Sequence, residues 1–246
     1  MKKILLLLLL VQTSLAFAIN PVNSYVKLTV KGKECILLLY NKTPQHRDNF
    51  LKLVREGFYN GTLFHRVISG FMIQGGDPDS KHAAPGALLG EGDLDYKIPA
   101  EFNDSLFHKK GALAAARDNN PEKASSAAQF YLVQGKTYTA KELDRMEELK
   151  FEGEKIPAYQ RAIYEHMGGT PFLDHNYTVF GEVVKGLDLI DSIAALPTDS
   201  NDRPLNDLPM EMAILTPLAT RKLEAELKGV PYKPNIFRRF LDLFAK

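Results

Sequence analysis

Residues 64–78 read FHRVISGFMIQGGDP, a stretch in which glycines follow short apolar segments. Two short apolar segments in this region, residues 63–67 and 71–74, are predicted strands. Gly75 and Gly76, followed by an Asp-Pro pair, predict a tight turn. No lysine and no helix pattern come next, so a phosphate-binding loop is a poor interpretation of these glycines.

Further short strands are predicted on both sides of this stretch. Residues 25–30 alternate between apolar and polar side chains, and residues 35–40 form the second strand of a hairpin. The remaining predicted strands cover residues 112–116, 130–133, 177–184 and 210–215. Many short strands with few helices are typical of a β-sandwich or a β-barrel.

Two helices are predicted within this β pattern. Thr43 is expected to cap the first helix, with Pro44 at its first position and Gly57 at its end. The second helix follows Gly186 and has one apolar face, formed by Leu187, Ile190 and Ile193.

Residues 135–169 predict a helical insertion between two strands. A capping-box pattern starts at Thr139, and the helix after it has one apolar face, formed by Leu143, Met146 and Leu149. Pro157 ends this pattern, and residues 159–167 predict a second helix. The insertion is too short to be an independent domain.

The N-terminal residues 1–18 have the pattern of a secretory signal peptide. Two lysines precede an apolar run, and Ala16-Phe17-Ala18 matches a cleavage site after Ala18. An uncleaved membrane anchor is the alternative, but the apolar run is short for a membrane span. Cys35 is the only cysteine, and an exported chain without disulfides fits a bacterial periplasm best, or a cell exterior.

The C-terminal residues 218–246 predict a helical tail. Within the tail, residues 235–246 predict a basic amphipathic helix, which suits either an anionic membrane surface or a protein contact. The chain therefore divides into a signal peptide (1–18), one catalytic or binding domain (19–217) and the tail (218–246).

Composition excludes several classes of function. The chain has 246 residues, with 31 Lys and Arg against 30 Asp and Glu, so it lacks the basic excess of nucleic-acid-binding proteins. A single cysteine excludes an intrachain disulfide and a cysteine-based zinc site. The spacing of His65 and Asp77 leaves a hydrolase open, but no nucleophile accompanies them.

The stretch 64–78 resembles the signature of the cyclophilins, the peptidyl-prolyl cis–trans isomerases. Five further blocks resemble this family in the same order, namely residues 49–61, 98–102, 129–133, 172–174 and 177–183. The resemblance implies a mostly β fold, a closed eight-stranded antiparallel barrel capped by the two helices. The insertion at 135–169 and the C-terminal helical tail are additions to that fold.

The residue types suit this reaction. Rotation about a peptide bond must overcome a barrier of about 18–20 kcal/mol, because resonance is lost. No covalent bond changes, so the reaction requires no nucleophile, metal or cofactor. A guanidinium beside an apolar pocket can favour the twisted amide over both planar forms.

The resemblance assigns roles to ten residues. Arg66 is implied to be the catalytic guanidinium. The implied substrate-binding residues are Phe71, Met72, Gln74, Ala116, Gln129, Tyr131, Phe172, Leu173 and Tyr177. Gln74 and Gln129 are expected to bind the peptide backbone or to orient Arg66, and Ala116 to line the channel through its backbone.

Three positions depart from the family pattern. Phe172 stands where many members have tryptophan, which implies weak or no binding of cyclosporin. Tyr177 stands where many have histidine, and Tyr131 where many have phenylalanine. The hydroxyl of Tyr131 needs a hydrogen-bond partner or water, so activity could be reduced. The loop 117–128 also differs from the family pattern.

The expected function is acceleration of X–Pro rotation in exported, unfolded or partly folded proteins, a folding and chaperone role. A peptide-binding holdase that uses the same groove with little catalysis is the alternative. The expected partners are proline-containing polypeptides, with no nucleic acid and no cofactor.

Overall fold

The computed structural model describes residues 23–234. The predicted signal peptide 1–18 and the predicted amphipathic helix 235–246 lie outside these residues. The described chain forms two compact units: Val26–Ile214, and a smaller unit in which residues 23–25 come together with 215–234. Among the helices of residues 23–234, none has the length and apolar character needed to cross a membrane.

Eight strands form one antiparallel sheet. Their bounds are β1 Ser24–Val30, β2 Lys33–Leu39, β3 Phe64–Ile68, β4 Met72–Gly75, β6 Ala112–Ala115, β8 Phe130–Val133, β9 Val179–Lys185 and β10 Met210–Ile214. They pair in the order β10-β1-β2-β9-β6-β8-β4-β3, while the short strands β5 (Lys97–Ile98) and β7 (Ser125–Ser126) pair with each other.

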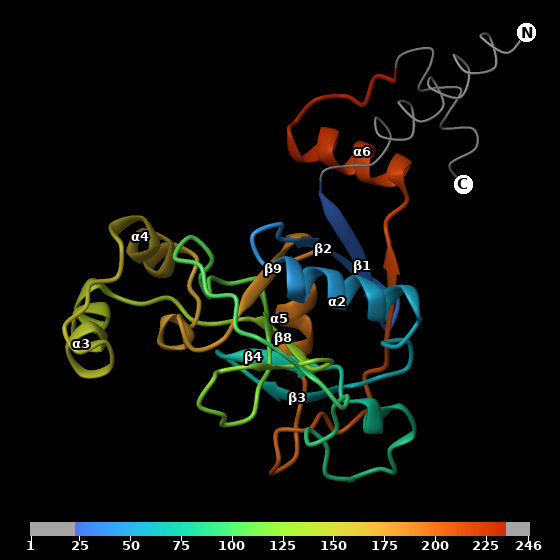
Figure 1. Cartoon of the computed structure of the whole chain (residues 1–246), viewed down its shortest axis with the longest axis horizontal. Helices are drawn as coiled ribbons and strands as arrows, with labels where there is room; N and C mark the ends of the chain where they lie inside the picture. Colours follow the sequence, from blue (N-terminus) through green and yellow to red (C-terminus); the bar gives the residue numbers. More distant parts are fainter. Residues whose placement is uncertain (1–22, 235–246) are drawn as a thin grey trace, which may run out of the picture. The chain divides into compact units, whose positions relative to one another are not determined.

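The sheet curls into a half-barrel and does not close, so the predicted closed barrel is wrong (Figure 1). The edge strands β3 and β10 share no ladder. Residues 61–64 make the contact instead, through a bridge between Leu63 and Pro209 and three backbone hydrogen bonds. These run from Gly61 N to Met210 O (2.9 Å), from Met210 N to Thr62 O (2.9 Å) and from Phe64 N to Leu208 O (3.1 Å). β3 has only five residues, and a register shift against β4 between Phe64 and Arg66 bends it.

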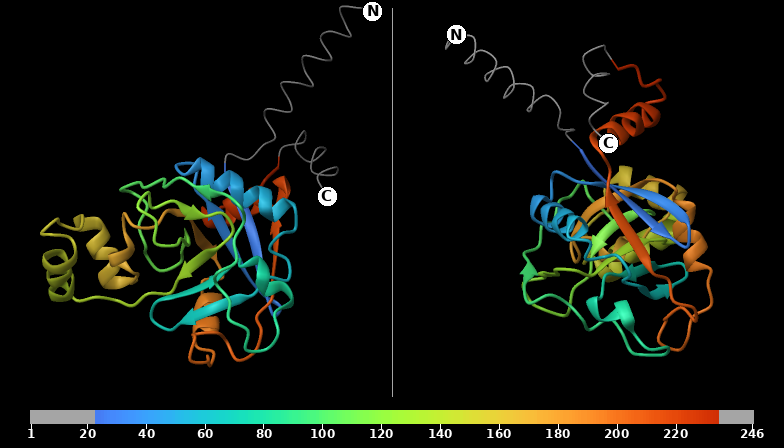
Figure 2. Two further views of the ribbon diagram at one scale, coloured as in Figure 1. Left: turned by 60° about the horizontal axis from the view of Figure 1, so that its bottom comes forward. Right: turned by 90° about the vertical axis from the view of Figure 1, so that its right-hand side faces the viewer.

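Both predicted helices pack on the core of the sheet. The helix α2 (Pro44–Arg55) contributes Phe50 and Leu53, and α5 (Asp188–Ala194) contributes Ile190 and Ile193. They lie at opposite ends of the half-barrel (Figure 2) and contact the same core. The side chain of Thr43 makes no capping bond to α2, contrary to prediction.

Alternation along the strands sorts side chains onto two faces. Val67, Ile73 and Leu132 belong to the main core, which lies inside the half-barrel. Their neighbours Met72 and Tyr131 belong to a separate apolar cluster on the other face of the same strands. The sheet therefore has a second, outer apolar face, and this face carries the candidate site.

The helical insertion is confirmed as two helices, α3 (Ala140–Lys150) and α4 (Ala158–His166), which lie together beside the sheet (Figure 1). The predicted capping box is present, with Thr139 and Glu142 bonding reciprocally. The two helices share a small core with a residue of the main chain before β6. Its buried members are Phe107, Tyr138, Leu143, Ile156 and Tyr164.

One face of α3 differs from prediction. Leu149 is 70% exposed, and the carboxylate of Glu147 is buried instead. Glu147 Oε1 accepts from Arg161 Nη1 (2.6 Å), and Oε2 accepts from Lys155 Nζ (2.8 Å). On the buried face of α3, the position where a leucine was expected is therefore occupied by Glu147. Its side chain forms an ion pair with Arg161 of α4.

The insertion ends at a glycine that the packing requires. Gly169 has φ +155°, and a Cβ there would lie 2.2 Å from the carbonyl oxygen of His108. The backbone of Gly169 forms bridges with both Lys109 and Lys136. This close approach ties the end of the insertion to its beginning and to the main chain before β6.

The smaller unit contains the helix α6 (Pro217–Leu227), part of the predicted helical tail. Thr216 caps this helix by accepting from the backbone N–H of Ala219. Asn23 Nδ2 donates to Glu224 Oε1 (3.0 Å), and Leu215 N donates to Tyr25 O (2.9 Å).

Candidate active site

The strand register places the central site residues in one row. Arg66 of β3 is opposite Gln74 of β4, Gln74 is opposite Tyr131 of β8, and Tyr131 is opposite Ala114 of β6. Directly paired residues point to the same face of a sheet. The row therefore follows from the sheet itself and gives the outer face a cation, an amide, an aromatic ring and a methyl group in sequence.

A pocket of about 160 Å³ lies over this row. Eight of the ten predicted site residues line it, together with one that was not predicted, Arg117. The lining residues are Arg66, Phe71, Met72, Gln74, Ala116, Arg117, Tyr131, Leu173 and Tyr177. The pocket is apolar at its floor, and the two guanidinium groups supply the charge.

Arg66 lies at the rim of the pocket, with its side chain 43% exposed. Its Nη1 lies 3.5 Å from Gln74 Oε1, and its Nε lies 3.7 Å from the carboxylate of Asp202. Both contacts are long, and the ion pair is exposed, so neither uses the donors of the guanidinium fully. Sequence reasoning missed Asp202, which carries no motif.

Two glutamines orient one another beneath Arg66. Gln129 Nε2 donates to the carbonyl oxygens of Gly90 and Gly92, and Gln129 Oε1 accepts from Gln74 Nε2 (2.9 Å). Gln74 is thereby fixed with its oxygen toward Arg66. Gln129 is buried and outside the pocket lining, so of the two expected roles it has the geometry for orientation rather than peptide contact.

Tyr131 forms the floor, and its hydroxyl has a partner. His108 Nε2 lies 2.9 Å from the hydroxyl oxygen, and the two rings stack with 13° between their planes. Burial raises the pKa of Tyr131 well above its usual value, which keeps the hydroxyl protonated. The polar atom that sequence reasoning identified as a difficulty is therefore satisfied away from the pocket.

The walls come from the segment after the insertion. Leu173 lines the pocket, whereas Phe172 lies beside it, with its ring 5.7 Å from the ring of Phe71. The guanidinium of Arg117 lies 4.8 Å from the ring of Tyr177 and donates to the carbonyl oxygen of Asn176. The sequence did indicate that the loop 117–128 differs from the family pattern, and Arg117 is the first residue of this loop.

The backbone of Ala116 is already engaged. Its N–H donates to Gln129 O (2.9 Å), and its carbonyl oxygen accepts from Ser126 N (2.8 Å). The carbonyl has a second lone pair, which is the backbone group that a peptide could use here. Of the two backbone groups of Ala116, only the carbonyl oxygen can therefore make the predicted contact with a peptide.

A second, larger pocket of about 520 Å³ lies between the insertion and the loop 174–176. Its lining includes Phe151, Lys155 and Gln160 from the insertion. The groups around it carry charges of both signs, and none of the ten predicted site residues lines it. The predicted site residues therefore meet at the smaller pocket.

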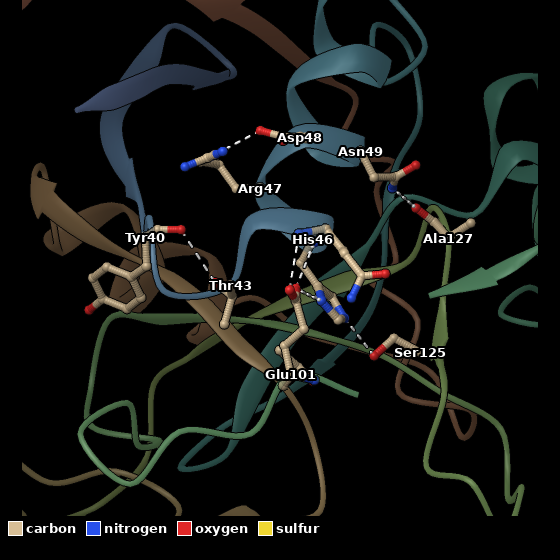
Figure 3. A network of polar contacts seen from close by, with 11 residues as sticks. Tyr40, Thr43, His46, Arg47, Asp48, Asn49, Glu101, Ser125 and Ala127 are labelled. Atoms are coloured by element: carbon tan, nitrogen blue, oxygen red, sulfur yellow. Dashed lines mark hydrogen bonds and ion pairs between the residues drawn. The ribbon is translucent and has the colours of Figure 1, made fainter. Parts of the chain in front are cut away.

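A serine, a histidine and a glutamate also meet at the N-terminus of α2 (Figure 3). His46 Nδ1 lies 2.7 Å from Glu101 Oε2, and His46 Nε2 lies 2.9 Å from Ser125 Oγ. Ser125 is 1% exposed, so no substrate reaches it as a nucleophile. Glu101 accepts the backbone N–H groups of Gln45 and His46, which makes it the cap of α2 in place of Thr43.

The hydrolase alternative finds no support at His65 and Asp77. Asp77 Oδ1 accepts from the backbone N–H of Asp79, Oδ2 accepts from that of Gly90, and Asp77 caps a short 3₁₀ helix. The predicted tight turn at residues 75–78 is wrong, because Gly75 ends β4 and the 3₁₀ helix Pro78–His82 begins directly after Asp77. In residues 23–234, no cluster of three or more His, Cys, Asp or Glu side chains has the arrangement of a metal site.

Comparisons of sequence point to one family. A sequence model of the cyclophilin type peptidyl-prolyl cis-trans isomerase/CLD family matches residues 25–214. A Staphylococcus saprophyticus protein named as a peptidyl-prolyl cis-trans isomerase is 33% identical over 183 residues, covering 74% of this chain and 86% of the relative. A Streptococcus pyogenes protein named as a bifunctional phosphatase/peptidyl-prolyl cis-trans isomerase is 36% identical over 192 residues, but this chain spans 37% of its length.

Comparison of structures gives the same fold. A crystal structure of a cyclophilin type peptidyl-prolyl cis-trans isomerase from Cryptosporidium parvum matches with a TM-score of 0.59 at 20% identity, covering 79% of this chain and 98% of that one. A second structure of that protein, determined in the presence of the dipeptide Ala-Pro, matches with a TM-score of 0.56 at 20% identity, covering 78% and 99%. At this identity the likeness concerns the fold.

Proposed function

Since the chain belongs to the cyclophilin-type peptidyl-prolyl cis–trans isomerases, we propose that its pocket on the outer face of the sheet holds the proline of the substrate and that Arg66 is the catalytic residue. The observation that carries this proposal is the register that sets Arg66, Gln74 and Tyr131 side by side on the outer face of the sheet. Eight of the ten expected residues line a single pocket as a result.

Arg66 acts on the twisted amide. When the peptide bond rotates, resonance is lost and the proline nitrogen regains a lone pair that can accept a hydrogen bond. A guanidinium at the rim can donate to this nitrogen, and the planar ground states do not present the same acceptor. Gln74, held by Gln129, directs its oxygen at Arg66 and so limits the orientations of the guanidinium.

The pocket holds the ring while the rest of the bond turns. Phe71, Met72 and Leu173 supply apolar walls, and the ring of Tyr131 supplies the floor. A pyrrolidine ring removes apolar area from water in such a site, and this fixes one side of the rotating bond. The free carbonyl side then moves past Arg66.

The first test is the rate of cis–trans relaxation of a proline peptide. We expect Arg66→Ala to lower kcat/KM by about 100-fold, the scale of removing one donor to a transition state. The matched control is Arg55→Ala, the same change at an exposed position on α2, which should retain wild-type kcat/KM. An Arg66→Ala variant as active as the wild type would overturn the role of Arg66.

The proposed substrates are exported proteins with exposed X–Pro bonds. The basis is the signal-peptide pattern of residues 1–18, with a periplasmic location after cleavage at Ala18. Cell fractionation with and without residues 1–18 tests this location. The tail over residues 235–246 is proposed to contact a membrane surface or a protein, and its deletion should change fractionation without changing turnover of a small peptide.

The holdase alternative uses the same groove without useful catalysis. The observation that favours it is a second guanidinium at the pocket, that of Arg117, which is held by Tyr177 and by the carbonyl oxygen of Asn176. A fixed second cation there gives a bound peptide contacts that do not act on the rotating bond. One sample assayed for both isomerisation and aggregation suppression separates the two. Suppression without isomerisation supports the holdase. Cyclosporin should inhibit weakly, since Phe172 has no indole N–H.

A further inference from the structure

A series of hydrogen bonds connects the floor of the pocket with the insertion. The hydroxyl of Tyr131 bonds His108 Nε2 (2.9 Å), and His108 Nδ1 bonds Asp174 Oδ1 (2.8 Å). The other oxygen of that carboxylate, Oδ2, accepts from the hydroxyl of Tyr164 on α4 (2.6 Å). Four side chains from β8, the segment before β6, the segment before β9 and the insertion thus form one connected unit.

The donors and acceptors of the unit agree with each other. A carboxylate only accepts, so Nδ1 of His108 carries the proton that it donates to Asp174. In the neutral imidazole Nε2 is then an acceptor, and the hydroxyl of Tyr131 donates to it. Burial raises the pKa of both tyrosines, Tyr131 and Tyr164, so both hydroxyls keep the protons that this arrangement requires.

Three of the four members of the unit are buried, and the side chain of Asp174 is 10% exposed. Tyr131 is 4% exposed, His108 1% and Tyr164 0%. A buried donor or acceptor that loses its partner destabilises the folded state, so a shift of one member either moves the next member or leaves it without a hydrogen bond. The ring of Tyr131 is therefore connected to the hydroxyl of Tyr164 in the insertion through two side chains, those of His108 and Asp174.

The same carboxylate also anchors the wall of the pocket. Asp174 directly follows the 3₁₀ turn Pro171–Leu173, and its Oδ1 also accepts from the backbone N–H of His108 (2.8 Å). Thr170 N donates in turn to the carbonyl oxygen of His108 (2.8 Å). The insertion touches this wall a second time, since Lys150 Nζ lies 4.9 Å from the ring centroid of Phe172.

We propose that the insertion is a positioning unit for the proline pocket, with Tyr164, Asp174 and His108 as positioning residues that set the floor ring of Tyr131 and the wall at Leu173. This inference rests on the proposed function of the pocket. It assigns to residues 135–169 an effect on the affinity and rate of the isomerase reaction, because a binding site holds its ligand best when its groups are fixed before binding.

A double-mutant cycle on Tyr164 and Tyr131 tests the proposal. Tyr164→Phe removes one hydroxyl and should lower kcat/KM for a proline peptide by about threefold to tenfold, the equivalent of one hydrogen bond. In the Tyr131→Phe background the floor ring is no longer tied to His108, and only the wall at Leu173 still depends on Asp174. Tyr164→Phe should then lower kcat/KM by a clearly smaller factor than in the wild-type background.

The matched control is Tyr159→Phe. Tyr159 lies on the same helix, and its hydroxyl donates to the carbonyl oxygen of Asp104 (3.0 Å), outside the connected unit. This variant should keep wild-type kcat/KM in both backgrounds. Thermal unfolding of each variant shows whether the chain still folds, and kcat/KM is compared at a temperature where all variants are folded.

The outcomes are distinct. An unchanged kcat/KM in Tyr164→Phe, or an equal loss in both backgrounds, would overturn the proposal, because a purely structural role gives additive effects. If the wild-type chain shows no isomerisation, the proposed catalysis fails instead, and the same cycle is measured on the affinity for the proline peptide. Additive effects on that affinity would then overturn the positioning role as well.

Discussion

Two buried histidines have the same set of partners but serve different regions. His46 lies between the carboxylate of Glu101 and the hydroxyl of Ser125, and His108 lies between the carboxylate of Asp174 and the hydroxyl of Tyr131. The first unit caps α2 and joins it to the small sheet of β5 and β7. The second unit includes the floor of the proline pocket.

The comparison shows that an acid–histidine–hydroxyl arrangement does not by itself indicate catalysis. In the unit around His46 the hydroxyl is enclosed, and the carboxylate accepts two backbone N–H groups. In the unit around His108 the hydroxyl belongs to a ring whose face lines a pocket. The role of each unit therefore depends on the surroundings of its hydroxyl residue, Ser125 in one unit and Tyr131 in the other.

The largest effect is expected for a change at Glu101, the carboxylate of the unit around His46. Glu101→Gln replaces a carboxylate that accepts from the backbone N–H groups of Gln45 and His46 and from His46 Nδ1, and the amide places a donor against donors. We expect the free energy of unfolding to fall by about 2 kcal/mol, with kcat/KM of the folded fraction unchanged. Denaturant unfolding and the peptide assay measure the two. A loss of activity at full folding would contradict the structural assignment.

The equivalent change in the other unit is Asp174→Asn. The amide cannot accept from both His108 and Tyr164 with full strength, so the floor and the wall of the pocket lose a common anchor. We expect kcat/KM to fall by about tenfold in molecules that remain folded. Steady-state kinetics together with thermal unfolding checks this. If Glu101→Gln and Asp174→Asn changed kcat/KM by the same factor, the functional difference between the two units would be contradicted.

A third buried histidine, His65, differs from the other two because it has no carboxylate bonded to it in the described chain. Burial lowers the pKa of His65 to about 4. Between about pH 4 and 6.5 the unfolded chain binds a proton that the folded chain does not, so stability falls as pH falls through this window. We expect His65→Gln to reduce the slope by about 1.4 kcal/mol for each pH unit, with exposed His82→Gln as the control. Parallel curves for wild type and His65→Gln would contradict this.

Much of the site could be predicted because the chemistry is local in sequence. Arg66, Phe71, Met72 and Gln74 lie within nine residues, and the short strands there fix which side chains share a face. The helices after Thr43 and Gly186 and the capping box of the insertion follow from local rules as well. These elements agree with the structure within a few residues.

The rest depends on contacts between distant residues. Glu101 replaces Thr43 as the cap of α2, although 58 positions separate them, and no local pattern gives that distance. The need of Tyr131 for a partner was visible in the sequence, but His108 and Asp174 were not identifiable as that partner. The half-barrel likewise depends on how the edge at β3 bends, which hydrophobic alternation does not specify.

The most direct test of the account separates binding from rotation at Arg66. NMR exchange spectroscopy on a proline peptide measures the catalysed cis–trans rate, and a titration of the same sample measures affinity. We expect Arg66→Ala to abolish most of the catalysed exchange, while the peptide still binds the apolar pocket within about tenfold of the wild-type affinity. Exchange at the wild-type rate in Arg66→Ala would contradict it.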